Sequence, residues 1–119
     1  MKRILLAMTC AALPLMSSTP ILAQSQTYLS GNNELPGCRD LLAGRFMGIT
    51  TTRCLTITTT LAELQPLIDM KLRACMPNGV IPRQMVAIII QYADRNPKQL
   101  HLPLSQIAQR ALREAWPCT

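Results

Sequence analysis

Apolar residues recur at the three- and four-residue spacing of an amphipathic helix along two stretches in the second half of the chain. In the first stretch, Pro82 can open a helix and Pro97 ends it. Its main apolar positions are Met85, Ile88, Ile89, Tyr92 and Ala93. The second stretch begins at Leu104 and carries the cleanest apolar stripe of the sequence. The pattern therefore predicts two helices, of which the first, apolar on several sides, is the central one.

The N-terminal part of the chain has a weaker pattern. Residues 24–36 are rich in Ser, Asn, Gly and Gln, a composition that predicts a flexible lead-in. Leu42 and Phe46 share one helical face, which predicts a short helix within residues 38–47. The folded domain is therefore expected to begin at about residue 37 and to extend to residue 119.

The middle of the chain gives two conflicting signals. Residues 49–60 alternate threonine with leucine and isoleucine, which favours a strand. An apolar face at helical spacing continues to Leu72, which favours a helix over residues 60–73 with a bend near Pro66 or a helix start there. A turn is expected at residues 75–79. The overall prediction is an all-α domain, a small disulfide-stapled bundle of about four helices.

The first 23 residues have the organisation of a secretory signal. Lys2 and Arg3 precede a short apolar run, and Ala23 is a small residue at the expected cleavage point. A membrane-spanning helix would require about 20 unbroken apolar residues, and Pro14 interrupts this stretch. We therefore expect cleavage near Ala23, no membrane-spanning segment in the mature chain, and a periplasmic location.

Four cysteines remain after removal of the signal, which contains Cys10. They are Cys38, Cys54, Cys75 and Cys118. An even number of cysteines in an exported chain of this size predicts two disulfides, for which three pairings exist. The position of the cysteines around the expected helices favours one pairing, in which Cys38 joins Cys54 and Cys75 joins Cys118. Other pairings remain open at this stage.

Composition and motifs argue against catalysis and nucleic-acid binding. Removing Lys2 and Arg3 lowers the formal charge from +6 to +4, and the remaining cations are scattered among few aromatic residues. The single histidine, His101, has no catalytic neighbour in the sequence, and the carboxylates show no pairing typical of acid–base chemistry. The cysteine spacing does not fit a zinc site. We expect no enzyme activity, no metal and no cofactor, which leaves binding as the activity.

Several motifs over about the last 45 residues resemble a known family. They are CMPNGV at 75–80, Gln84, IIIQY at 88–92, NPKQLH at 96–101 and ALREAWPC at 111–118. In combination they resemble the Rap/Tai family of immunity proteins, which act against amidase effectors of type VI secretion systems. The resemblance implies an all-helical, disulfide-bonded and often dimeric periplasmic protein that blocks a peptidoglycan amidase by occupying its active site.

The resemblance also carries over individual residues. The motif positions expected to be structural are Pro77, Gln84, Tyr92, Pro97, Trp116 and Pro117. Residues expected in exposed connections, and so able to contact a protein partner, are Arg45, Arg53, Lys98 and His101. An alternative function is a periplasmic chaperone or stress-stability protein without a cognate toxin, because a wide apolar face such as that of residues 85–93 would bind unfolded chains.

Overall fold

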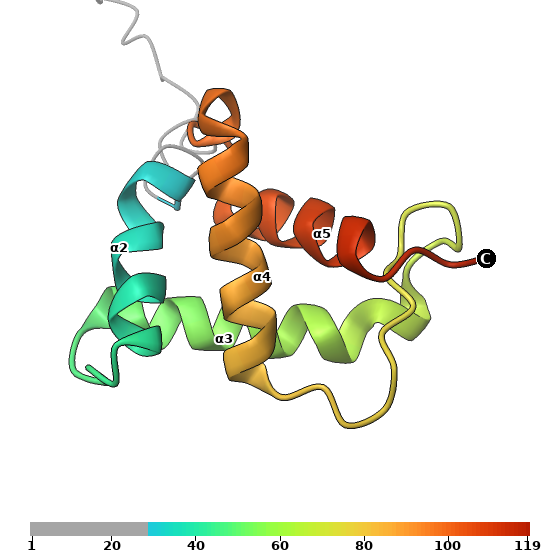
Figure 1. The fold of residues 1–119 in the computed structure, drawn as a ribbon, viewed down its shortest axis with the longest axis horizontal. Helices are drawn as coiled ribbons and strands as arrows, with labels where there is room; N and C mark the ends of the chain where they lie inside the picture. Colours follow the sequence, from blue (N-terminus) through green and yellow to red (C-terminus); the bar gives the residue numbers. More distant parts are fainter. Residues whose placement is uncertain (1–28) are drawn as a thin grey trace, which may run out of the picture.

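The computed structural model describes residues 29–119, and this part of the chain contains four α-helices and no β-strand (Figure 1). The helices are α2 (Gly31–Leu42), α3 (Ile49–Leu64), α4 (Pro82–Arg95) and α5 (Leu104–Ala115). Two short 3-10 segments are η1 (Gln65–Leu67) and η2 (Pro97–Gln99). The all-α fold class is therefore confirmed. The expected signal, residues 1–23, and the start of the lead-in lie outside the described residues.

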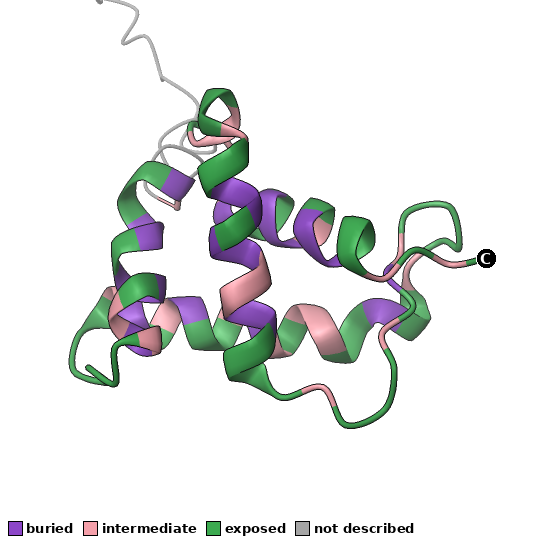
Figure 2. Ribbon diagram, viewed as in Figure 1, coloured by how far each residue is buried: buried purple, intermediate pink, exposed green. Residues whose placement is uncertain are grey.

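Helix α4 is central, as its wide apolar face predicts. It packs against α2, α3 and α5, and all four helices carry buried residues (Figure 2). Val86 and Ile89 of α4 and Ile107 of α5 are completely buried. Burial of such side chains stabilises a domain by about 1.5–3 kcal/mol each. None of the described helices is both long and apolar enough for a membrane span.

Helix α2 corrects the expected lead-in, because it begins at Gly31 rather than near residue 37 and ends at Leu42 rather than near residue 47. Its first turn is bound to the segment before α5, since the backbone N–H groups of Gly31 and Asn32 donate to the carbonyls of Leu102 and Leu100, both at 2.9 Å. Pro36 lies inside the helix. Tertiary contacts therefore outweigh the polar, glycine-containing composition that predicted flexibility.

Gly37 of α2 lies directly against the backbone of α3. A Cβ atom at this position would meet the carbonyl of Thr50 and the amide nitrogen of Thr51, both at 2.6 Å, and backbone atoms cannot move aside without shifting the helix. We expect Gly37→Ala to destabilise the protein by about 1–3 kcal/mol. Urea unfolding followed by circular dichroism measures this change.

The same substitution in a helix without such a contact stabilises by roughly 0.5–1 kcal/mol. Gly31→Ala is a suitable comparison, because there the Cβ atom would mainly meet the end of the flexible Ile107 side chain. We expect Gly31→Ala to cost less than Gly37→Ala. A Gly37→Ala protein as stable as the wild type would contradict the close helix packing.

Helix α3 corrects the expectation of a possible strand followed by a helix over residues 60–73. The helix is continuous from Ile49 to Leu64, and Pro66 lies beyond its end in η1. Its buried positions, Thr51, Cys54 and Thr58, recur at helical spacing. The β-branched threonines are accommodated because this face packs against α2 and α4.

Two disulfides hold the helices, and they have the pairing that the sequence favours. Cys38–Cys54 joins α2 to α3 with a Cα–Cα distance of 5.4 Å, and both residues are completely buried. Cys75–Cys118 joins the segment after α3 to the segment after α5, with a Cα–Cα distance of 5.0 Å. One bridge thus lies in the core and the other near the surface, where Cys75 is exposed.

Candidate functional site

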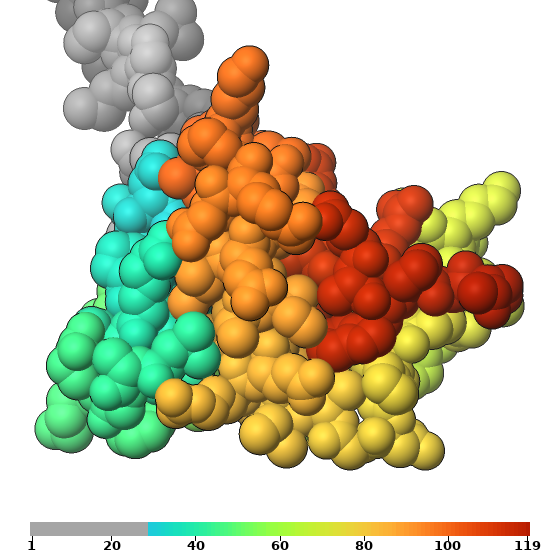
Figure 3. All heavy atoms as spheres, in the orientation of Figure 1, coloured from blue at the N-terminus to red at the C-terminus, as the bar shows by residue number. Residues whose placement is uncertain are grey.

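The segment that joins α3 to α4, residues 65–81, forms one end of the molecule and is here called the α3–α4 connection. In Figure 3 its lime to yellow atoms extend beyond α5 (red). It exposes large apolar side chains: Leu67 is 82 % exposed, Met70 65 % and Leu72 56 %. Clusters of exposed apolar residues of this kind commonly mark protein interaction sites. The connection is therefore the first candidate for a partner surface.

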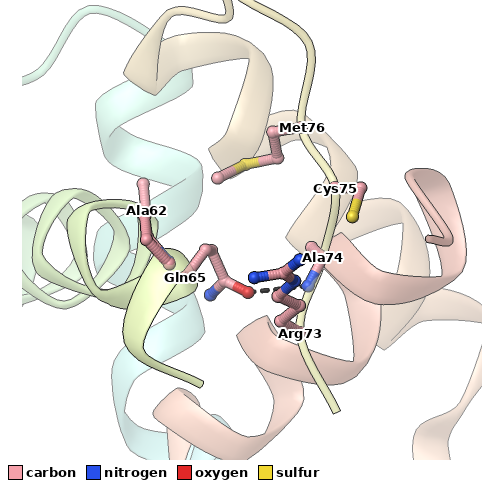
Figure 4. A pocket seen from close by; sticks show the side chains of 7 residues that line it. Ala62, Gln65, Arg73, Ala74, Cys75 and Met76 are labelled. Carbon is pink, nitrogen blue, oxygen red and sulfur yellow. Dashed lines mark hydrogen bonds between the residues drawn. The ribbon is translucent and has the colours of Figure 1, made fainter. Parts of the chain in front are cut away.

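Gln65 fixes the base of the connection (Figure 4). Its side chain is almost fully buried, and its amide nitrogen donates to the Leu61 carbonyl and to Gln109 Oε1, both at 2.8 Å. Its Oε1 accepts a hydrogen bond from the Ala74 N–H at 2.7 Å. One buried glutamine therefore joins the end of α3, the far side of the connection and α5.

Further bonds hold the same segment against α5. Gln109 Nε2 donates to the Leu72 carbonyl at 2.6 Å. The Cys75 N–H donates to the Trp116 carbonyl at 2.8 Å, next to the Cys75–Cys118 disulfide. Because these contacts fix the backbone in advance, a partner that binds the exposed side chains pays little to order the segment.

Two hollows flank the connection. A pocket of about 250 Å³ lies between the end of α3 and residues 73–76, lined among others by Ala62, Gln65, Arg73 and Met76 (Figure 4). A second hollow of about 420 Å³ lies between the connection and α5. It is lined by Ile68, Leu72, Gln106, Gln109, Arg110 and Arg113. Both hollows combine apolar carbon with guanidinium groups, so their chemistry suits acidic groups with apolar neighbours.

The four expected partner-contact residues do not form one surface. Arg45 follows α2 and pairs with Asp40. Lys98 and His101 are exposed in the α4–α5 connection, which contacts the opposite end of α2 through Leu100. A 12-residue helix, about 18 Å long, separates the two positions.

Arg53 is partly buried and lies between α2 and α3. Its Nε donates to Glu34 Oε2 at 3.0 Å, and its Nη2 lies 3.0 Å from Glu34 Oε1. The Glu34 side chain is 1 % exposed and that of Arg53 22 %. This arrangement is an ion pair with one hydrogen bond, from Nε to Oε2, and it joins α2 to α3.

The motif residues differ in their surroundings. Tyr92 is buried and donates its hydroxyl to Gln99 Oε1 at 3.0 Å, as expected of a structural residue. Trp116 packs against the small core cluster of Ala74, Met85 and Leu112, and Pro97 opens η2. Gln84 is exposed and lies outside the core. Pro77 and Pro117 are also exposed.

A second group of exposed apolar residues, here called the Phe46 surface, lies at the other end of α3. Phe46 is 65 % exposed, Met47 92 % and Ile49 67 %. Beside them is an apolar pocket of about 210 Å³ lined by Leu41, Phe46, Leu55, Pro82 and Arg83. The structure therefore has two separate apolar surfaces, one at each end of α3.

The electrostatics of the described residues show no catalytic arrangement. Residues 29–119 contain no group of three His, Cys, Asp or Glu side chains placed to hold a metal. Titration is clearly perturbed at a surface pair between α2 and α4: the hydrogen bond and charge of Arg39 lower the pKa of Asp94, and Asp94 raises the pKa of Arg39. A carboxylate held by a surface arginine is a structural feature.

Sequence patterns missed the α3–α4 connection, because the apolar residues from 61 to 72 suggested a helix that continues to residue 73. The signal that could have located it is Pro66, whose missing N–H favours a helix end.

Comparison with known proteins gives one match. A family model described as Rap1a immunity proteins matches residues 26–118, which include all four helices and both disulfides. No curated protein and no solved structure matches the chain.

Proposed function

Because this chain belongs to the Rap1a immunity protein family, we propose that it protects its cell by binding a secreted peptidoglycan amidase and blocking that enzyme's active site. Membership of the family implies a cognate toxin as partner. The amidase and the periplasmic location are part of the proposal. They are supported by the signal-like N-terminus and by two disulfides, which persist in oxidising compartments.

The observation that carries the proposal is the combination of exposure and rigidity in the α3–α4 connection. Leu67 and Met70 are exposed on a segment that Gln65, Gln109 and a disulfide hold in place. An inhibitor acts by shape and charge complementarity rather than by chemistry, so it needs such a preformed projection. We infer that this connection contacts the toxin.

The prediction concerns the double variant Leu67→Asp/Met70→Asp. We expect it to weaken binding of the secreted hydrolase encoded by the neighbouring open reading frame by about 100-fold or more, because central apolar contacts carry about 2 kcal/mol or more each. Isothermal titration calorimetry and protection of peptidoglycan from digestion are the two measurements.

The control is Met47→Asp, which places one new carboxylate on the Phe46 surface at the other end of α3. We expect it to bind the hydrolase as the wild type does. The proposed contact is rejected if Met47→Asp abolishes binding and Leu67→Asp/Met70→Asp does not.

The resemblance also implies a homodimer, and we propose the Phe46 surface for that contact. Phe46, Met47 and Ile49 form a group of exposed apolar residues that the toxin contact would leave free. Sedimentation equilibrium of the wild type and of Met47→Asp tests this, with a monomeric variant and a dimeric wild type as the expected result.

The chaperone alternative loses its basis in the structure. It rested on the wide apolar face of α4, but Met85, Val86 and Ile89 are buried against the other helices. Suppression of aggregation of unrelated unfolded proteins by the native domain would nevertheless favour that function over toxin binding.

A further inference from the structure

The arginines of residues 29–119 differ in whether the protein supplies them with an acceptor. Six of them donate to a carboxylate, a carbonyl or a side-chain amide within the fold: Arg39, Arg45, Arg53, Arg83, Arg95 and Arg110. Arg73 and Arg113 have no such partner within the described residues. Arg73, in the α3–α4 connection, lines the first of the two hollows described above, and Arg113, in α5, lines the second.

Arg73 is the more informative of the two, because it is partly buried. Its Nε is inaccessible to solvent and has no hydrogen-bond acceptor in the protein. Figure 4 shows its guanidinium beside Gln65 and Ala74 in the pocket. Gln65 Oε1, which belongs to the same pocket, already receives hydrogen bonds from Ala74 and Gln109. A buried donor without an acceptor costs about 1–3 kcal/mol, so the site favours any group that supplies one.

The charges near the pocket favour an anion. This end of the molecule carries four cations, Lys71, Arg73, Arg110 and Arg113, and three acidic side chains, Glu63, Asp69 and Glu114. Asp69 Oδ1 accepts the backbone N–H of Lys71 at 2.8 Å, and Glu114 pairs with Arg95. No acidic side chain of the described residues lies within ion-pair distance of Arg73. The charge of Arg73 is therefore left for a partner to neutralise.

We propose that the pocket beside residues 73–76 receives a carboxylate side chain of the toxin, and that Arg73 binds it. The inference rests on the proposed function and names the chemistry of its partner surface. A guanidinium presents parallel N–H groups that match the two oxygens of a carboxylate. Leu67 and Met70, exposed on the same connection, would exclude water from the contact, and Arg113 would attract the acidic surface from a distance.

The first experiment tests the pocket without the toxin. The oxidised mature protein, labelled with ¹⁵N, is titrated with a capped peptide, acetyl-Gly-Glu-Gly-amide, while the Nε–H signals of its arginines are followed by NMR. The expected result is a saturable shift of the Arg73 signal with a millimolar dissociation constant and no comparable shift of Arg45. An equal shift with acetyl-Gly-Gln-Gly-amide, or no shift of Arg73, would overturn the proposal.

The second experiment uses the hydrolase encoded by the neighbouring open reading frame. Arg73→Met keeps the aliphatic part of the side chain and removes the charge, and we expect it to weaken binding by about 30-fold or more. Arg73→Lys should lie between this variant and the wild type, because a lysine keeps the charge but not the paired N–H groups. Thermal unfolding of each variant verifies that the fold is retained.

Arg39→Met is the matched control for charge. Arg39 is half-exposed on α2, where it pairs with Asp94 near the C-terminal end of α4, and its loss should change binding less than twofold. If Arg73→Met binds the hydrolase as tightly as the wild type does, the carboxylate pocket is rejected and the immunity function is kept. A wild-type protein that does not bind or inhibit the hydrolase would reject the immunity function itself.

Discussion

Replacing Arg53 by methionine is expected to lower the free energy of unfolding by about 3–5 kcal/mol. The carboxylate of Glu34 is buried between α2 and α3, and Arg53 holds both of its oxygens at 3.0 Å. Removal of the arginine leaves a buried charge without a counter-ion, which is far more costly than the loss of a surface ion pair. Chemical denaturation at neutral pH measures the change.

A double variant separates the loss of the charge partner from the loss of packing. In Glu34→Leu/Arg53→Met both charges are removed and the volumes are approximately kept, so we expect most of the lost stability to return. Arg45→Met is a surface control, because its ion pair with Asp40 is exposed and should contribute no more than about 1 kcal/mol. A double variant as unstable as Arg53→Met would argue that packing of the arginine stem, rather than its charge, is what matters.

Removing the Cys75–Cys118 disulfide is expected to affect both stability and toxin binding. The bridge closes a loop with a sequence separation of 43 residues, for which chain entropy predicts a stabilisation of about 4 kcal/mol. It also holds the α3–α4 connection beside the end of α5. Cys75→Ser/Cys118→Ser should therefore unfold more easily and, even while folded, bind the hydrolase more weakly.

The Cys38–Cys54 disulfide provides the comparison. Its sequence separation is 16, which corresponds to about 3 kcal/mol, and it lies in the core at a distance from the connection along α3. Cys38→Ser/Cys54→Ser should lose stability but keep its affinity, when affinity is measured per folded molecule. Equal losses of affinity in the two double variants would contradict a specific role of the outer bridge.

The helices predicted best from the sequence are α4 and α5, in which the spacing of the apolar residues within the helix itself identifies the buried face. Ile107, Ala108, Ala111 and Leu112 of α5 are buried as their spacing predicts, and so is the apolar face of α4. The disulfide pairing was also predictable, because the cysteines bracket these elements. In each case the information is local to one helix or to the order of the elements along the chain.

Helices α2 and α3 were predicted poorly because neighbouring segments determine them. Gly37 allows close contact between the two helices, and Thr51 and Thr58 face the core in place of larger apolar residues. Neither role is visible in a local pattern. The same reason explains Arg53, which the sequence placed on the surface: its partner, Glu34, is 19 residues away.

The candidate site was harder to predict than the fold. Its chief residues, Leu67, Met70 and Arg73, lie within residues 60–73, where the sequence favoured a helix. They belong to a connection because α3 ends at Leu64. Residues that contact a partner need no internal periodicity, so their role becomes apparent only when their exposure and their lack of internal partners are known.

The order of the cysteines bears on how the protein matures. Within residues 29–119 the cysteines pair in their order along the chain: the first, Cys38, with the second, Cys54, and the third, Cys75, with the fourth, Cys118. An oxidase that acts on a polypeptide as it leaves the translocon, N-terminus first, meets the cysteines in this order. Under the export proposed above, oxidation of successive pairs produces the native bridges directly, and we expect maturation not to require a disulfide isomerase.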